Sequence, residues 1–203
     1  MSEEFWEGRY REQPQIWSGR PNAQLVAVVS ALPPGAALDL GCGEGGDAVW
    51  MAQQGWRVTA VDVSQTALDR AAARAQELGV ASRISFQQKD LATAGTDGEF
   101  DLVSAQFLQS PVDFPRDEVL RRAAGAVAPG GLLLIVDHAS APPWGKHAHT
   151  HALPTAGETF ASLALPRDGW TVEVLQVRER EASGPDGETA TLRDNVIALR
   201  RQR

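Results

Sequence analysis

Short apolar runs alternate along this chain with segments of helical periodicity. Leu68, Ala71, Ala75 and Leu78 recur at spacings of three and four residues, which predicts the apolar face of a helix. Runs of apolar and β-branched residues bounded by turn residues predict strands at 36–40, 57–63, 83–88, 100–106, 132–137, 170–180 and 189–199. Helices are expected at 46–54, 64–78, 156–163 and from Pro115 to a break at 129–131. This alternation is typical of a parallel sheet with helices on both faces.

The last two predicted strands differ from the others in their connection. Residues 183–187 read Ser-Gly-Pro-Asp-Gly, a connection rich in turn residues and too short for a helix. Strands joined in this way lie antiparallel as neighbours. The expected fold is therefore α/β: a doubly wound, Rossmann-like, seven-stranded and mostly parallel sheet with an antiparallel C-terminal strand.

The N-terminal section precedes this sheet without a change of composition. Residues 2–32 predict two helical pieces separated by 17–21, and Pro33-Pro34-Gly35 breaks the chain before the first strand. No repeat or low-complexity linker interrupts the chain. We therefore expect a single domain over 1–203, with a helical segment at 1–32 and a core at 36–200.

Composition and charge exclude several classes of binding partner and structural site for this chain. The 203 residues carry a formal net charge of −7, which argues against an extended phosphate-binding surface and hence against nucleic acid. A single cysteine, Cys42, excludes a disulfide framework and a multi-thiolate zinc site. No apolar run approaches the roughly 20 residues of a membrane helix, and the acidic N-terminus is no signal peptide. These features predict a soluble cytoplasmic protein without a membrane partner; they do not indicate an oligomeric state.

The most informative motif lies between the first strand and the first sheet helix. Residues 39–46 read Asp-Leu-Gly-Cys-Gly-Glu-Gly-Gly. Glycines at this position let the backbone turn sharply and let a ligand approach the main chain without meeting a Cβ atom. An ordinary strand-to-helix turn would explain the glycines alone equally well.

Two acidic residues at the next strand ends favour a ligand. Asp62 ends the second strand, 17 residues after Gly45, where a carboxylate can accept both hydroxyl groups of an adenosine ribose. Asp90 follows the third strand, where it can accept from the exocyclic amine of an adenine. Polar groups at successive carboxyl ends of parallel strands form one edge of a crevice.

With these residues in place, the chain resembles the class I, seven-stranded S-adenosylmethionine-dependent methyltransferases over about residues 36–200. The N-terminal run, with Tyr-Arg-Glu at 10–12 and Trp-Ser-Gly-Arg-Pro-Asn at 17–22, is similar to small bacterial members grouped with tellurite-resistance and thiopurine methyltransferases. The resemblance implies S-adenosylmethionine as methyl donor and an antiparallel seventh strand.

The resemblance also implies a set of cofactor-binding residues: Asp39, Gly41, Gly43, Glu44, Gly45, Asp62, Val63, Asp90, Leu91 and Gln106. Asp39 and Glu44 would lie near the amino end of the methionine part, and Asp62 would take the ribose. Asp90 would flank the adenine amine, and Gln106 would face the methionine part and the methyl group.

An N-terminal segment closes over the cofactor in such relatives. Trp17 and Arg20 are therefore candidates for a lid, with Arg20 on the cofactor carboxylate. A tryptophan that pins a helix to the core and an arginine on a solvated turn are the alternative interpretation.

Nicotinamide-binding Rossmann proteins are the nearest competing class. Their motif places the third glycine three residues after the second, whereas Gly45 follows Gly43 by two. Tyr10 is the only tyrosine, so the chain has no Tyr-x-x-x-Lys pair for hydride transfer. No phosphate-binding G-x-x-x-x-G-K-[ST] loop is present.

The sequence therefore predicts a methyltransferase acting on a small-molecule acceptor. Transfer from a sulfonium depends mainly on alignment, and a base is needed only when the acceptor must lose a proton, so no catalytic residue is assigned. Acceptor-handling candidates are 107–112 and His138. His147, His149 and His151 alternate along a polar loop, in a spacing compatible with metal binding, substrate lining or a plain surface loop. A cofactor-binding sensor without transfer activity and a His-loop metal protein remain the alternatives.

Overall fold

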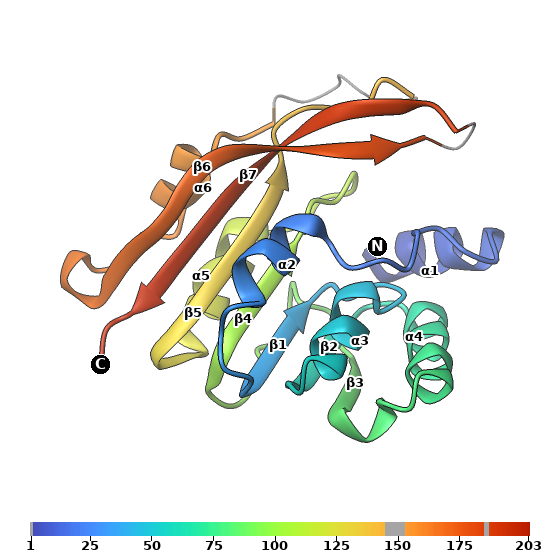
Figure 1. Ribbon diagram of the computed structural model, residues 1–203, viewed down its shortest axis with the longest axis horizontal. Coiled ribbons are helices and arrows are strands. Elements are labelled where there is room, and N and C mark those ends of the chain that lie inside the picture. The colour runs from blue at the N-terminus through green and yellow to red at the C-terminus, as the bar shows by residue number, and fades with distance from the viewer. Residues whose placement is uncertain (1, 145–152, 185–186) are drawn as a thin grey trace.

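The computed structural model describes residues 2–144, 153–184 and 187–203 and is built on one seven-stranded sheet (Figure 1). The strand order is β3-β2-β1-β4-β5-β7-β6. The strands are β1 Ala36–Leu40, β2 Arg57–Asp62, β3 Ile84–Gln88, β4 Phe100–Gln106, β5 Val127–His138, β6 Trp170–Ser183 and β7 Thr189–Arg201. Strands β1 to β5 pair in parallel, and β7 runs antiparallel between β5 and β6. The predicted fold class is confirmed.

Helices cover both faces of this sheet. They are α1 Ser2–Glu12, α2 Ala23–Val29, α3 Gly46–Gln53, α4 Gln65–Glu77, α5 Arg116–Gly125 and α6 Ala156–Ser162, with single 3₁₀ turns at Ala81–Arg83 and Arg167–Gly169. Buried residues of α2 and α3 share one apolar cluster with the sheet, and those of α5 and α6 share another on the opposite face. The crossovers change face between β1 and β4. In doubly wound sheets a ligand crevice forms at this switch point, outside the carboxyl ends of the strands.

Local sequence explains where α4 begins and which face it buries. The Ser64 side chain caps the helix by accepting from Ala67 N at 3.1 Å. Leu68, Ala71 and Ala75 are buried as predicted, but Leu78 is 46% exposed. Leu78 is the C-cap residue, one position past the last helical residue, so it no longer continues the apolar stripe. That part of the prediction was wrong.

Strand β5 differs from its prediction. We expected Pro129, Gly130 and Gly131 to end a helix ahead of a strand that begins at Leu132. Instead α5 ends at Gly125, and β5 begins at Val127, which pairs with Phe100. The pairing register with β4 then shifts before Leu132, so the strand carries the Pro-Gly-Gly segment as an irregularity.

The N-terminal segment and one end of the β6–β7 hairpin approach the carboxyl edge of the sheet from different directions (Figure 1). Helix α1 lies beside α4, and the chain then passes to α2 (Figure 1). The β6–β7 hairpin is long and extends past the end of β5 at the same edge of the sheet (Figure 1). No helix within the described residues is long and apolar enough to cross a membrane.

Candidate functional site

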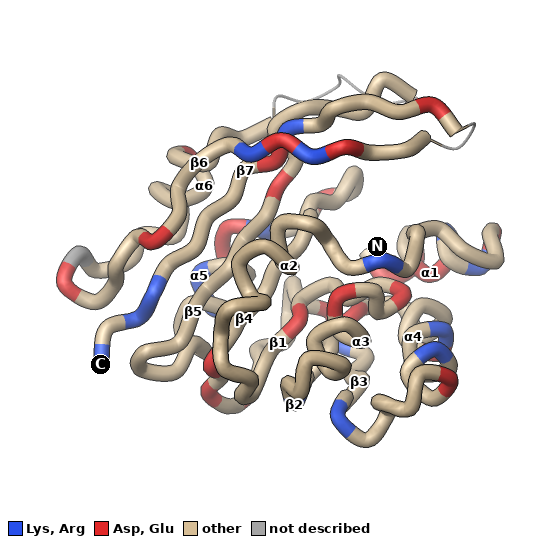
Figure 2. The backbone as a smooth tube through the Cα atoms, viewed as in Figure 1, with Lys and Arg blue, Asp and Glu red and all other residues tan. Residues whose placement is uncertain are grey.

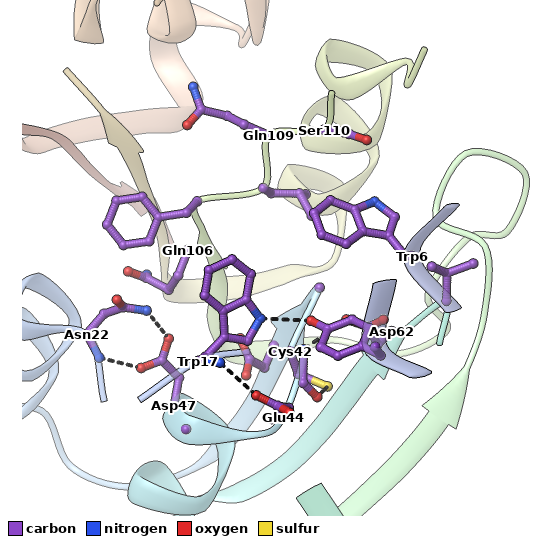
Figure 3. A pocket seen from close by; sticks show the side chains of 18 of the residues that line it. Trp6, Trp17, Asn22, Cys42, Glu44, Asp47, Asp62, Gln106, Gln109 and Ser110 are labelled. Carbon is purple, nitrogen blue, oxygen red and sulfur yellow. Dashed lines mark hydrogen bonds between the residues drawn. The ribbon is translucent and has the colours of Figure 1, made fainter. Parts of the chain in front are cut away.

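A cavity of about 390 Å³ lies at the carboxyl ends of β1, β2, β4 and β5. This volume is within the range of small-molecule sites, about 300–1,000 Å³. In Figure 3 the labelled side chains ring the cavity, with Gln106 and Gln109 on one side and Trp6 and Asp62 on the other. The switch point of the sheet thus carries a cavity large enough for a ligand.

The glycine loop forms the floor of this cavity. Gly41 and Gly43 both line it, and both have positive φ, 69° and 52°. A Cβ atom on Gly43 would lie 2.8 Å from the Tyr10 hydroxyl oxygen and 3.4 Å from the Trp17 indole. The second glycine is therefore required by both the backbone turn and the close approach of the N-terminal segment.

Asp62 links the glycine loop to the end of β2. One carboxylate oxygen accepts from Gly43 N at 2.8 Å, and the other accepts from Ser64 N at 2.9 Å. Burial raises the pKa of this carboxyl, and these backbone hydrogen bonds oppose the shift. Each oxygen keeps acceptor capacity beyond its backbone partner. The carboxylate is thus oriented in advance on the cavity wall.

Two more buried acids stand near Asp62. Asp39 Oδ2 has no hydrogen-bond partner, and burial together with Asp47 and Asp62 raises the pKa of Asp39 well above its usual range. Burial also raises the pKa of Asp47 to about 6, although Asn22 donates to it from N and Nδ2 at 2.6 Å each. Acidic positions gather around the start of α3 in Figure 2. This end of the cavity therefore favours a cationic group.

The Glu44 carboxylate holds the N-terminal segment. It accepts from Ile16 N at 3.1 Å, from Trp17 N at 2.9 Å and from Arg70 Nη1 at 2.8 Å. Arg70 also donates to the carbonyl oxygens of Tyr10 and Gln13. Glu44 lines the cavity as predicted, and its described partners belong to this segment and to α4.

Helix α1 is fixed to α4 by Glu7. Ser64 Oγ and Thr66 Oγ1 each donate to Glu7 at 2.6 Å, and these bonds lower the pKa of Glu7 to about 2. Further along, Trp17 Nε1 donates to the Tyr10 hydroxyl at 2.9 Å while the Trp17 side chain remains 48% exposed. Trp17 therefore lies over the glycine loop, partly exposed and hydrogen-bonded to the buried Tyr10 of α1.

The opposite end of the cavity has a different character. Phe107 follows β4 with φ of 52°, and its ring stacks on His138 with centroids 4.2 Å apart. The Arg180 Cζ atom lies 5.4 Å from the Phe107 ring centroid. Both His138 Nδ1 and Gln106 Oε1 are buried without a hydrogen-bond partner. This end combines aromatic surface with unsatisfied polar atoms.

A buried ion pair supports the loop after β4. Arg116 Nη2 contacts both oxygens of Asp137 at 2.5 and 2.6 Å, and Thr159 Oγ1 donates to Asp137 Oδ2 at 3.3 Å. Arg116 Nε also donates to the Leu108 carbonyl oxygen at 3.0 Å. Arg116 thereby ties the cavity-lining segment that begins at Phe107 to the end of β5.

The structure brings the sequence-predicted cofactor-binding residues to the wall of this cavity with one exception. Those on its wall are Trp17, Arg20, Asp39, Gly41, Gly43, Glu44, Asp62, Val63, Asp90, Leu91 and Gln106. Gly45 lies behind the wall, where a Cβ atom would approach Ala71 Cβ to 2.6 Å. Its place in the set is therefore corrected: Gly45 allows α3 and α4 to pack closely, and its neighbour Gly46 lines the cavity. Of the acceptor-handling candidates, the structure places residues 107–110 and His138 on the wall, but not Pro111 or Val112.

Sequence reasoning missed several lining residues, among them Trp6, Asn22, Asp47, Phe114 and Arg180. Asp47 carried one usable signal, an acid in the first turn of the helix that follows the glycine loop. The histidines at 147, 149 and 151 lie outside the described residues. Within the described residues, no group of three or more His, Cys, Asp or Glu side chains is arranged to hold a metal ion.

The chain is similar to known methyltransferases in sequence. Residues 37–131 match the family model described as "Methyltransferase domain". A relative from Mycobacteroides abscessus, 2-heptyl-1-hydroxyquinolin-4(1H)-one methyltransferase, is 28% identical over 83% of this chain and 74% of its own length. The chain spans less than half the length of two further curated relatives.

Solved structures show the same architecture. A structure described under the conversion of a disulfide bond into a thioacetal group during echinomycin biosynthesis superposes with a TM-score of 0.77 at 26% identity, covering 100% of this chain and 93% of that one. The N-methyltransferase NodS from Bradyrhizobium japonicum, solved with S-adenosyl-L-homocysteine, superposes with a TM-score of 0.70 at 18% identity over the full length of both chains. The second likeness concerns the fold alone.

Proposed function

This chain belongs to the class I family of S-adenosylmethionine-dependent methyltransferases, and we propose that it transfers the methyl group by in-line displacement to a small-molecule acceptor. The observation that carries the proposal is a single cavity with two chemically distinct ends. The acidic end suits the donor, and the aromatic end, with its unsatisfied polar atoms, is free for an acceptor.

The residues at the acidic end fit the methyl donor. Asp39 Oδ2 is a buried hydrogen-bond acceptor without a partner. The ammonium group of a methionine moiety would supply the missing donor. Asp62 keeps acceptor capacity for the hydroxyl groups of a ribose. Asp90 lies on the wall beside Leu91, where its carboxylate would accept a hydrogen bond from an adenine amine. Backbone at Gly41 and Gly43 leaves room for the ligand to pass between these groups.

When bound, S-adenosylmethionine supplies a methyl group on a positively charged sulfur. The chain's own contribution is alignment and exclusion of water. Gln106 ends β4 beside the glycine loop, with a buried Oε1 that has no partner, and Trp17 covers the loop from the N-terminal side. The acceptor would then enter from the side of Phe107 and His138.

The acceptor is proposed to be a small molecule because the cavity is small and partly enclosed. The mycobacterial relative is likewise named for a small molecule, a hydroxyquinolinone. Incubation with S-adenosylmethionine and a panel of thiols, phenols and amines tests the proposal. Formation of S-adenosylhomocysteine that depends on one of these acceptors is expected. Binding of the donor with no turnover across the panel would instead indicate a cofactor-binding sensor.

The buried acids at the donor end predict a pH-dependent trade-off between stability and binding. Because burial raises the pKa of Asp39 and Asp47, the folded state binds more protons than the unfolded state. The contribution of these two groups to the free energy of unfolding is therefore most favourable below about pH 4, which is their pKa in the unfolded chain. It is lost as the pH rises through their pKa values in the folded state, about 6 for Asp47. The Asp39→Asn substitution removes one charge from this cluster.

Asp39→Asn should raise the melting temperature more at pH 8 than at pH 5. Relief of an uncompensated buried charge is worth about 1–3 kcal/mol, or about 2–4 °C for each kcal/mol in a chain of this size. The same variant should bind S-adenosylhomocysteine more weakly. Thermal unfolding at both pH values measures the first effect, with Asp97→Asn on the surface as control. An increase in melting temperature that is equal at both pH values would contradict the link between the raised pKa of Asp39 and the stability of the folded state.

A further inference from the structure

The aromatic end of the cavity holds polar groups that the donor does not need. The acidic residues on the wall are Asp39, Glu44, Asp47, Asp62 and Asp90, which lie on or just after the first three strands and in the first turn of α3. The aromatic end carries Arg180 and His138 among the apolar side chains of Phe107, Leu108 and Phe114. Within the described residues, its wall contains no carboxylate.

Arg180 is held in place with most of its donors unused. Its Nε donates to Asp194 Oδ2 at 2.7 Å, which is the only hydrogen bond that Arg180 donates within the described residues. The Asp194 side chain is 0% exposed, whereas that of Arg180 is 22% exposed and lines the cavity. A guanidinium has five N–H donors in a planar fork, so the Nη groups remain for a ligand.

His138 adds a second polar atom beside this guanidinium. Its Nδ1 is buried and has no partner, and its ring stacks on Phe107. Burial and the charge of Arg180 lower the pKa of His138 to about 4, so the ring is neutral at physiological pH. A neutral imidazole can carry its proton on Nδ1 and donate from there.

Two carboxylates lie close behind this end of the cavity, and each is already paired with an arginine. Asp137 precedes His138 on β5, but it is fully buried and paired with Arg116. Asp194 is paired with Arg180 itself. Arg180 and His138 therefore both offer unused N–H donors on this wall, and the guanidinium carries a positive charge that a negatively charged ligand atom would complement.

We propose that Arg180 and His138 form an anion-binding subsite and that the methyl acceptor is a small aromatic acid bound as its anion. This inference rests on the proposed function, since it concerns the second substrate of the same cavity. In this arrangement the aromatic ring of the acceptor lies among the apolar side chains of the wall, and its charge lies against the guanidinium. The weak basicity of His138 agrees with an acceptor that arrives already deprotonated.

The balance of the reaction agrees with such an acceptor. Methyl transfer from a sulfonium to an anion forms one bond from carbon to the acceptor atom and breaks one carbon–sulfur bond. The electron pair of the broken bond stays on sulfur, which becomes a neutral thioether. Because the acceptor anion is neutralised at the same time, no proton has to leave and no general base is required.

Benzoate and benzamide form a matched pair of probes, because they share size and shape and differ in charge. We expect the protein saturated with S-adenosylhomocysteine to bind benzoate at least tenfold more tightly than benzamide in calorimetry. In turnover with S-adenosylmethionine, thiophenol should exceed aniline by at least tenfold.

The variant that tests the subsite must keep Asp194 from becoming an unpaired buried charge. In Arg180→Gln/Asp194→Asn both charges are removed together, and the preference for benzoate should fall at least tenfold while affinity for S-adenosylhomocysteine stays within about twofold. Arg180→Lys keeps the charge and should keep part of the preference. Arg178→Gln, two residues away on β6 and not on the cavity wall, should change neither value.

Three results would overturn the inference: equal affinity of the wild-type protein for benzamide and benzoate, binding of neither probe, or a full preference for benzoate in the double variant. In each case the titration with S-adenosylhomocysteine still reports on the donor site independently. If the protein does not bind S-adenosylhomocysteine in that titration, the proposed function is overturned and the acceptor subsite with it.

Discussion

Replacing Asp62 by alanine should lower the affinity for S-adenosylhomocysteine about a hundredfold or more. The carboxylate is oriented by Gly43 N and Ser64 N and lies 7% exposed on the cavity wall. Hydrogen bonds to a charged group are worth about 1.5–3 kcal/mol each, and 1.4 kcal/mol corresponds to a factor of ten. Loss of two such bonds to ribose hydroxyls gives the expected effect, measured by calorimetry.

Two further variants separate binding from folding in this experiment. Asp62→Asn keeps the shape of the side chain and one acceptor oxygen, so we expect a smaller loss of about tenfold. Asp69→Ala, on the exposed side of α4, should leave the affinity unchanged. If Asp62→Ala, shown to be folded by circular dichroism, binds with wild-type affinity, the assignment of the ribose to this carboxylate is wrong.

Arg116→Met should strongly destabilise the folded protein. The Asp137 side chain is 0% exposed and that of Arg116 only 14%, so the variant leaves a buried carboxylate without its cation. Breaking such a pair costs about 3–5 kcal/mol. Urea unfolding should report this loss as a lower midpoint. Because Arg116 also binds the Leu108 carbonyl, acceptor binding should weaken more than donor binding.

A double variant distinguishes the unpaired charge from general damage to α5. Arg116→Met/Asp137→Leu removes both charges and should recover much of the lost stability, since an apolar pair of similar volume often replaces a buried ion pair without cost. Arg121→Met, on the exposed side of the same helix, should change stability by no more than about 0.5 kcal/mol. Equal stability of the single and double variants would contradict the ion-pair explanation.

The sheet was predictable where the chain buries continuous apolar strands. The predicted bounds of β1 and β4 match the structure, because both strands are buried in the middle of the sheet and have turn residues on either side. The start of β5 was not predictable in the same way. Proline and glycine usually end an element, but here Val127 already pairs with Phe100 before the Pro-Gly-Gly segment.

The cavity wall that we propose for the donor was largely predictable as a cluster of residues, because these residues follow one local motif and the next two strand ends. Asp39, Asp62 and Asp90 meet at one edge once the strands run parallel. Gly45 is the exception, because it belongs to the motif but allows α3 to pack against Ala71. A spacing of glycines alone does not show which of them face a ligand and which face another helix.

The end of the cavity that we propose for the acceptor could not be derived in the same way, because its residues meet only through long-range packing. Arg180 lies on β6, an edge strand whose alternating charges are typical of a solvent-exposed surface. It reaches the cavity because β7 places β6 beyond β5 and the hairpin extends past the end of the sheet (Figure 1). The pairing of Asn22 with Asp47 likewise depends on the path of the N-terminal segment.

A crystal structure of the complex with S-adenosylhomocysteine is the most direct test of how the cavity is divided. We predict that both ribose hydroxyl groups lie at hydrogen-bond distance, about 2.6–3.2 Å, from the Asp62 carboxylate. The ligand's ammonium group should contact Asp39 Oδ2, and its sulfur should point toward Phe107 and His138. A ligand bound elsewhere, or one whose sulfur faces the acidic end, would contradict the division of this cavity between donor and acceptor.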